Sequence, residues 1–200
     1  MLDVNNDDIE HIYALSEGWV MALGLLSQRL AEETSTAGLV TTQGKLEDLF
    51  KYLATEVFMK QTPMIQQFLE QTSILDVLNG EMCDEVLGIN GSNNILQSLT
   101  ERHLFITVTG KNQYRYHALF KEFLERRFMG QEEQFLLLHK RCARWYMKQR
   151  DILPAISHFE KIGDYSSIGV LIHEHGIQLM EQGQLSYVLE KLLRISDEIK

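Results

Sequence analysis

The sequence predicts a mainly α-helical protein that contains one short β-hairpin. Through most of the 200 residues, apolar side chains recur at spacings of three and four, which is the pattern of amphipathic helices. The period changes around Gly110, where β-branched and aromatic residues flank the turn-forming residues 110–112. With 44% hydrophobic residues and two prolines, the chain has the composition of ordinary globular proteins, so we expect a packed core.

The N-terminal residues 1–33 carry a helical pattern that lacks a partner for its apolar face. The apolar positions that share this face are Ile12, Leu15, Trp19, Leu23, Leu26 and Leu30. Residues 34–45 are rich in Thr, Ser and Gly and show no period, which predicts a linker. A new unit therefore begins near Leu46.

Residues 46–129 form the second predicted unit. Thr62 and Pro63 supply a cap and a first-turn proline for a helix whose core face holds Ile65, Phe68, Leu69 and Thr72. Further helices are expected over residues 81–87 and 93–102. Residues 103–109 and 113–116 then read as two strands, and a last helix follows them. Three helices followed by a hairpin are the arrangement of a winged-helix domain.

Residues 130–200 are predicted to be helices separated by short turns. Phe135, Leu138, Cys142 and Trp145 line the first helix, and Pro154 opens the next, which buries Ala155, Ile156 and Phe159. Gly163 is predicted to end this helix and Asp164 to cap the following one. The apolar face of the last helix holds Leu185, Val188, Leu189 and Leu192. Each helical pair spans about thirty residues, so we expect TPR-like antiparallel hairpins at the start of a solenoid. Two pairs leave one end open, and the chain is expected to continue beyond Lys200.

Charge and cysteine content exclude several functions. A net charge of −9 has the wrong sign for a protein that coats nucleic acid or anionic lipid. Cys83 and Cys142 are too few for a disulfide framework and lack the spacing of a zinc site. No apolar run is long enough to span a bilayer, and the acidic start is unlike a secretion signal. These features predict a cytoplasmic protein with no membrane partner.

Several sequence blocks carry a family resemblance. Residues 68–76 (FLEQTSILD), 114–120 (YRYHALF) and 139–146 (HKRCARWY) strongly resemble the central region of LuxR-type regulators of the MalT kind, which are STAND signal-transduction NTPases. Residues 16–20 (SEGWV) resemble the end of the nucleotide-binding module of that family, and residues 151–171 resemble the first helices of its sensor solenoid. The resemblance covers nearly the whole chain.

The resemblance implies a longer regulator. Its parts would be an N-terminal ATPase module, a winged-helix domain, a helical solenoid that senses an inducer, and a C-terminal helix-turn-helix that binds promoter DNA. This chain contains no Gly-x-x-x-x-Gly-Lys-Ser/Thr loop to bind phosphates, so the ATPase centre is expected outside it. The C-terminal helix-turn-helix that would bind DNA is likewise expected outside it. ATP or ADP is therefore expected only in the full-length protein. We predict no catalytic residues and no enzyme activity in this chain.

His117 is the one candidate ligand-binding residue. The resemblance implies that the histidine of the motif Tyr-His-Ala-Leu-Phe contacts the phosphate of bound ADP and holds the resting form closed. A histidine can donate a hydrogen bond to a phosphate oxygen, so this chemistry is reasonable. The alternative is a histidine that caps the helix after Tyr116 and packs inside the domain. Arg115 is a weaker companion and fits a solvated wing residue.

The charges of the predicted winged helix argue against DNA binding by this fold. Its expected recognition helix, residues 93–102, holds one Arg and one Glu, and residues 46–88 carry eight acidic residues against two lysines. The later basic residues are Lys111, Arg115, Lys121, Arg126 and Arg127. Glu122 and Glu125 interleave with them at helical spacing, which predicts an ion-paired face.

Metal, catalytic and inducer sites are not predicted. His173 and His175 are two residues apart and would point to different sides of a helix, which also argues against a hydrolase built on them. His139 and Cys142 have a better spacing, but two groups do not complete a metal site. Trp145 shares a stripe with apolar core positions, which favours packing over an inducer groove. The remaining hypotheses are a regulatory relay that clamps the nucleotide-binding module, and a helical protein-interaction scaffold unrelated to nucleotide sensing.

Overall fold

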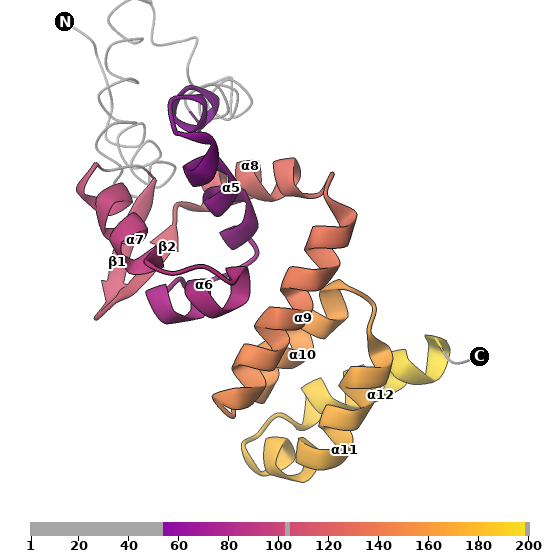
Figure 1. Cartoon of the computed structure of the whole chain (residues 1–200). Helices are drawn as coiled ribbons and strands as arrows, with labels where there is room; N and C mark the ends of the chain where they lie inside the picture. Colours follow the sequence, from indigo (N-terminus) through magenta and orange to yellow (C-terminus); the bar gives the residue numbers. More distant parts are fainter. Residues whose placement is uncertain (1–53, 103–104, 199–200) are drawn as a thin grey trace, which may run out of the picture. The chain divides into compact units, whose positions relative to one another are not determined.

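The structure is a computed structural model that describes residues 54–102 and 105–198 (Figure 1). The predicted units 1–33 and 34–45 lie outside the described residues. The mainly helical fold class is confirmed, because the described residues contain eight labelled helices and one two-stranded sheet. They fall into two compact units: a first unit of residues 54–80 and 91–128, and a second unit of residues 81–90 and 129–198.

The helices of the first unit begin where the local sequence predicts. Thr62 caps helix α5 (Pro63–Thr72), because its hydroxyl oxygen accepts a hydrogen bond from the backbone nitrogen of Ile65 at 3.5 Å. Helix α7 (Ser92–Glu101) follows Gly91, whose φ of 88° lies in the left-handed region that favours glycine. Both helices bury one apolar face against the rest of this unit.

The predicted hairpin is confirmed as strands β1 (Ile106–Gly110) and β2 (Gln113–Tyr116). The strands are antiparallel, with Ile106 opposite Tyr116 and an irregularity between Val108 and Gly110. The second strand has the predicted bounds. The first begins at Ile106 rather than at 103, and residues 103 and 104 lie outside the described part of the chain. The backbone groups of Leu78 and Tyr114 exchange hydrogen bonds of 2.8 and 2.9 Å, which extend this ladder.

An aromatic core joins the hairpin to helix α8 (Ala118–Phe128). The ring of Phe105, just before β1, stacks on the ring of Phe120 with centroids 4.4 Å apart and planes 12° apart. The hydroxyl groups of Tyr116 on β2 and Thr72 on α5 lie 2.7 Å apart in a buried hydrogen bond. These contacts fix α5, β2 and α8 to one another.

The second unit consists of helices that pack on their neighbours along the chain. They are α6 (Gly80–Leu87), α9 (Glu132–Lys148), α10 (Ile152–Lys161), α11 (Tyr165–Glu181) and α12 (Leu185–Glu198). Helix α10 packs against both α9 and α11, and α12 packs against α11, which agrees with the predicted helical hairpins. Gly163 has a φ of 66°, and the Asp164 carboxylate accepts a hydrogen bond from the Ser167 nitrogen at 3.1 Å, so the predicted stop and cap are confirmed.

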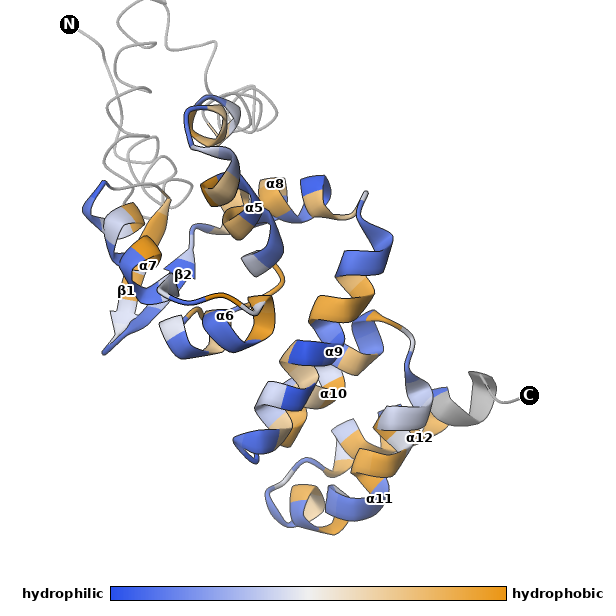
Figure 2. Ribbon diagram, viewed as in Figure 1, coloured by the Kyte–Doolittle hydropathy of each residue, from blue (hydrophilic) through white to orange (hydrophobic). Residues whose placement is uncertain are grey.

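The core of the second unit collects the apolar faces of α9 to α12, and Figure 2 shows orange segments along these helices. Ala155, Ile156 and Phe159 are buried as predicted. The predicted last face is mostly exposed: only Val188 is buried, whereas Leu185, Leu189 and Leu192 are 45–50% exposed. Lys191 is buried beside Val188, because its ammonium lies 2.8 Å from both carboxylate oxygens of Glu160.

We predict that Phe120→Ala strongly destabilises the first unit. Phe120 is 1% exposed and stacks on Phe105, so the substitution opens a cavity and should lower the free energy of unfolding by about 3–5 kcal/mol. Urea unfolding followed by circular dichroism measures the change. The matched control is Met64→Ala on α5, where the side chain is 65% exposed and the expected change is within about 0.5 kcal/mol. Equal effects of the two substitutions would contradict this core.

Candidate functional site

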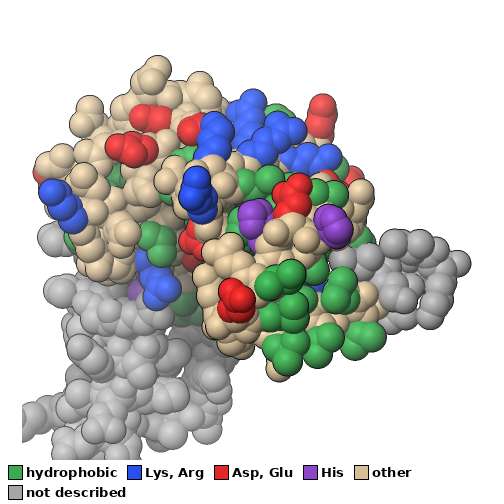
Figure 3. Space-filling model, turned by 90° about the horizontal axis from the view of Figure 1, so that it is seen from below, with side chains coloured by type: hydrophobic (Ala, Val, Ile, Leu, Met, Phe, Trp, Pro, Cys, Tyr) green, Lys and Arg blue, Asp and Glu red, His purple; other side chains and the backbone are tan. Residues whose placement is uncertain are grey.

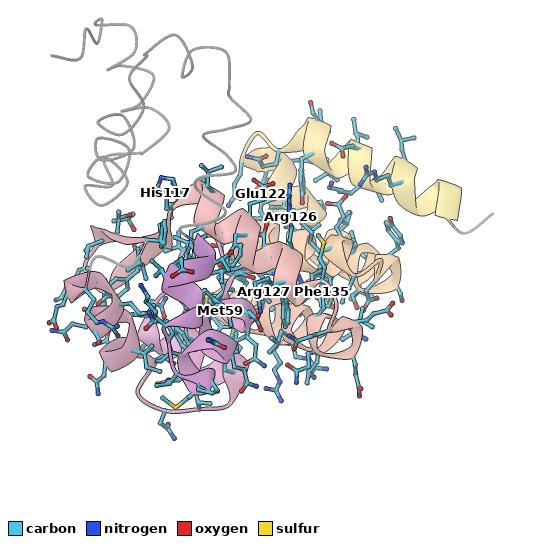
Figure 4. All side chains as sticks on the ribbon, turned by 90° about the horizontal axis from the view of Figure 1, so that it is seen from above. Met59, His117, Glu122, Arg126, Arg127 and Phe135 are labelled. Atoms are coloured by element: carbon cyan, nitrogen blue, oxygen red, sulfur yellow. The ribbon has the colours of Figure 1, made fainter. Side chains whose placement is uncertain are left out.

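His117 lies at the junction of the wing and helix α8, as the sequence predicts (Figure 4). Its backbone nitrogen donates a hydrogen bond to the carbonyl oxygen of Phe105 at 2.8 Å, and its carbonyl oxygen accepts one from the nitrogen of Lys121 at 2.9 Å. A residue outside the helix whose carbonyl accepts the first intrahelical bond occupies the N-cap position. The backbone of His117 therefore starts α8 and ties it to the segment before β1.

The ring of His117 is packed inside the first unit. The side chain is 4% exposed, and its ring meets the ring of Phe105 edge to face with centroids 6.5 Å apart. This geometry agrees with the capping and packing interpretation of His117. A contact with an ADP phosphate needs a ring nitrogen to face the nucleotide, and that contact stays a prediction. Arg115, its weaker companion, is exposed on β2.

Helix α7 presents a surface that is polar but almost uncharged. Its exposed residues are Asn93, Asn94, Gln97, Ser98 and Glu101. The amide of Gln97 donates a hydrogen bond to the Glu101 carboxylate at 3.1 Å. Arg102 directly follows the helix and is the one basic residue near this face. Such a helix supplies little of the positive charge that binding to phosphates requires.

The basic residues of α8 are paired with carboxylates. Lys121 forms ion pairs with Asp76 and, at 3.6 Å, with Glu125. Arg126 pairs with Glu122 one turn earlier, and Figure 4 shows these two side chains on α8.

Arg127, the last basic residue of α8, is held by a carboxylate and an aromatic ring. Its Nε lies 2.9 Å from Glu70, and its guanidinium lies over the Phe58 ring at 4.4 Å from the centroid. The ion-paired face that the sequence predicts is therefore present, and these cations are engaged within the domain.

The histidines considered for a metal site do not converge. His173 is exposed on α11, and His175 lies 3.9 Å from its neighbour Glu174. In the described part of the chain, no group of three or more His, Cys, Asp or Glu side chains is placed to hold a metal ion. Cys142 is fully buried, and burial, together with the nearby Cys83, raises the pKa of its thiol. A neutral, buried thiol acts as a core side chain rather than as a ligand.

Two buried histidines form a pair that sequence reasoning did not find. The Nδ1 atoms of His139 on α9 and His158 on α10 lie 2.9 Å apart, and the side chains are 3% and 8% exposed. Tyr146 stacks on His158 with ring centroids 5.6 Å apart, so this ring belongs to the packing between helices. The two histidines are 19 residues apart, and only the packing of α9 on α10 brings them together.

His139 is uncharged at physiological pH. Burial, followed by the effects of His158 and Lys161, lowers the pKa of His139 from 6.5 to about 3. One Nδ1 must carry a proton and donate it to the other, since a hydrogen bond between two ring nitrogens needs one protonated and one unprotonated nitrogen. The pair therefore stabilises the α9–α10 hairpin only while it stays uncharged.

Comparison with known proteins finds a match to one continuous stretch of the chain. The family model described as the MalT winged helix domain matches residues 54–136. This stretch is therefore similar to the MalT winged helix domain. The chain is also 29% identical over 189 residues to the HTH-type transcriptional regulator MalT of Vibrio campbellii, which covers 92% of this chain and 21% of the regulator.

Other relatives match over similar lengths. The MalT regulator of Vibrio parahaemolyticus is 27% identical over 98% of this chain, and the serine/threonine-protein kinase PknK of Mycobacterium tuberculosis is 24% identical over 91%. The chain spans about a fifth of the length of these MalT regulators. The resemblance to MalT-type regulators is therefore confirmed. Within the described residues, no helix has the length and apolar character needed to cross a membrane.

We predict that acid selectively weakens the second unit. The pKa of His139 is lower in the folded state than in the unfolded state, so the folded state binds fewer protons than the unfolded state as the pH falls. The contribution of His139 to the free energy of unfolding is therefore complete above about pH 6.5 and is lost as the pH falls toward 3. Between pH 7 and pH 5 the loss should be about 2 kcal/mol. Urea unfolding at the two pH values measures it.

The matched variants for this test are His139→Asn and His173→Gln. An Asn amide occupies nearly the place of Nδ1 and keeps a hydrogen-bonding group beside His158 without titrating. In His139→Asn, most of the roughly 2 kcal/mol loss of unfolding free energy between pH 7 and pH 5 should therefore disappear. In His173→Gln, whose side chain is exposed, the loss should be the same as in the native chain. The same acid sensitivity in all three proteins would show that the buried pair is not responsible.

Proposed function

We propose that this chain is the central regulatory segment of an ATP-dependent, LuxR/MalT-like transcriptional activator of the cytoplasm. In this proposal, the first unit contacts a nucleotide-binding module of the same protein, and the second unit begins the solenoid that senses an inducer. Promoter DNA would be bound by a separate C-terminal domain. The observation that carries the proposal is the MalT winged helix match over residues 54–136, with similarity to MalT regulators on both sides of it.

The charge distribution of the first unit supports a regulatory role over DNA reading. The exposed face of α7 is nearly uncharged, and Lys121, Arg126 and Arg127 of α8 are paired with carboxylates. Releasing those cations to bind phosphates would break ion pairs within the domain, so a protein surface is a better partner for this winged helix. The domain would act on its neighbours in the chain.

The position of His117 supports a role in coupling the bound nucleotide to the conformation of the first unit. Its backbone joins the segment before β1 to the start of α8, so a change at its ring reaches both the wing and the helix. A ligand that binds the closed state better than the open one shifts the equilibrium between them. ADP, held partly by His117, would stabilise the closed state, and inducer binding would oppose it.

A second candidate function is a helical protein-interaction scaffold without a role in nucleotide sensing. The similarity to the kinase PknK favours it, because a similar stretch of sequence occurs in a protein named for a different activity. The exposed leucines of α12 also leave an apolar face open to a partner. The regulator hypothesis requires a phosphate-binding loop upstream and a helix-turn-helix downstream in the same gene, which the scaffold hypothesis does not.

We predict that changing His117 in the full-length regulator weakens the ADP-bound resting state. Loss of a charge-assisted hydrogen bond to phosphate costs about 1.5–3 kcal/mol, which corresponds to roughly 10- to 150-fold faster ADP release and activation at lower inducer concentration. His117→Phe is the informative variant, because it keeps a ring against Phe105 while it removes both nitrogens. His117→Ala removes this packing as well. ADP release is measured by stopped-flow displacement of a fluorescent analogue.

The control for this experiment is Arg115→Ala on the exposed side of β2. It should leave ADP release within about 2-fold of the native protein, since a solvated wing residue contributes little binding energy. Native ADP release in His117→Phe, together with a lowered melting temperature in His117→Ala, would assign His117 to packing and capping only.

We further predict that this chain by itself neither hydrolyses ATP nor binds DNA tightly. It contains no phosphate-binding loop, and its net charge is −9. Non-specific DNA binding should be no tighter than about 10⁻⁶ M at roughly 150 mM salt. Fluorescence anisotropy with a random duplex and a phosphate-release assay measure the two activities. Submicromolar binding or steady phosphate release from the purified chain would contradict the prediction.

A further inference from the structure

Helix α9 and the two residues after it contain the largest concentration of positive charge in the sequence. Between residues 134 and 150 there are five basic residues and no acidic one: Lys140, Arg141, Arg144, Lys148 and Arg150. The whole chain has 19 basic and 28 acidic residues, so the remainder has 14 basic against 28 acidic and a net charge of −14. Charge is therefore strongly segregated onto this helix.

Only part of this charge is used within the second unit. Arg141 donates a hydrogen bond to the carbonyl oxygen of Val86 at 3.0 Å, and Lys148 forms an ion pair with Glu85, which attaches α6 to α9. Lys140 and Arg144 are exposed, and no acidic side chain of the described residues lies within ion-pair distance of them. They stand one helical turn apart on the same side, which Lys148 continues.

Apolar side chains share this exposed surface. Leu136 and Leu137 are 40% and 46% exposed, and Met147 is 39% exposed three turns further along. We call these three residues together with Lys140, Arg144 and Lys148 the α9 outer face. In Figure 2, hydrophobic and strongly hydrophilic segments alternate along α9, and Figure 3 shows a group of Lys and Arg side chains on one face of the molecule. The surface is both basic and apolar.

We propose that the α9 outer face binds an acidic amphipathic helix of a partner protein. Lys140 and Arg144 would meet carboxylates on the borders of that helix, and the exposed leucines and methionine would meet its apolar stripe. The face extends about 16 Å from Leu136 to Met147, which suits roughly three turns of a helix. The proposal does not depend on nucleotide sensing by the first unit.

An acidic helix fits this surface better than a nucleic acid. A phosphate backbone would pair with the cations, but it would place the exposed leucines and methionine against a highly charged ligand, where they contribute no binding energy. The remaining net charge of −14 would also repel a long polyanion. A short acidic helix carries less charge and supplies apolar contacts for the same residues.

The test measures binding of a fluorescent synthetic peptide by anisotropy at about 150 mM salt. The probe is a helical peptide of about 20 residues, with leucines at spacings of three and four and glutamates beside them. We expect saturable binding that Lys140→Glu/Arg144→Glu weakens by roughly 10-fold or more, since each carboxylate then faces a like charge. Leu137→Ser/Met147→Ser should also weaken it, because apolar contact is lost.

The matched control is Lys111→Glu/Arg115→Glu on the exposed wing, which changes the net charge of the chain by the same amount. It should change the affinity by less than about 2-fold, because neither residue belongs to the α9 outer face. All substituted residues are exposed, and circular dichroism verifies that each variant is folded.

Two further probes separate the proposed partner from other polyanions. One is a peptide of the same composition in a scrambled order that breaks the leucine stripe, and the other is a random duplex of about 20 base pairs. Both should bind at least roughly 10-fold more weakly than the amphipathic peptide. The proposal is overturned by no saturable binding up to about 1 mM, by equal losses in the wing control, or by equal or tighter binding of either probe.

Discussion

The stacking of Phe105 on Phe120 is the contact on which the winged-helix unit depends. It joins the segment before β1 to the first turn of α8, and Tyr116 adds an edge-to-face contact with the same Phe120 ring. The hydrogen bond between Tyr116 and Thr72 then brings α5 to this aromatic group. A two-stranded hairpin is marginal by itself in water, so the wing needs these rings to hold it against the helices. His117 occupies its position because this core fixes the residues on both sides of it.

Positive charge has different roles on the two long helices α8 and α9. On α8, Lys121 and Arg126 pair with carboxylates, and Arg127 also packs on the Phe58 ring. On α9, Lys140 and Arg144 extend from a face that also carries exposed apolar residues. Cations held inside a domain support its fold, whereas exposed cations beside apolar side chains suit recognition of a partner.

Buried polar groups set the packing between the helices of the second unit. His139 and His158 satisfy each other between α9 and α10, and Lys191 of α12 reaches Glu160 of α10 across the hairpins. Burial opposes ionisation of Glu160, but its hydrogen bond with Lys191 and the charge of Arg194 lower its pKa overall. A buried polar group without a partner is costly, so these pairs favour one packing arrangement of the helices over others.

The sequence by itself determined several of the element boundaries. Thr62 with Pro63, the turn after Gly110, and Gly163 with Asp164 act through the backbone of their nearest neighbours, and β2 has its predicted bounds. The family could also be inferred, because its motifs are local strings of residues. The tertiary structure decided the burial of the His117 ring, the pairing of His139 with His158, and the choice of Val188 and Lys191 over the leucines of α12 as buried residues. Each of these depends on side chains that are far apart in the sequence, and periodicity shows which residues share a helix face but not what that face meets.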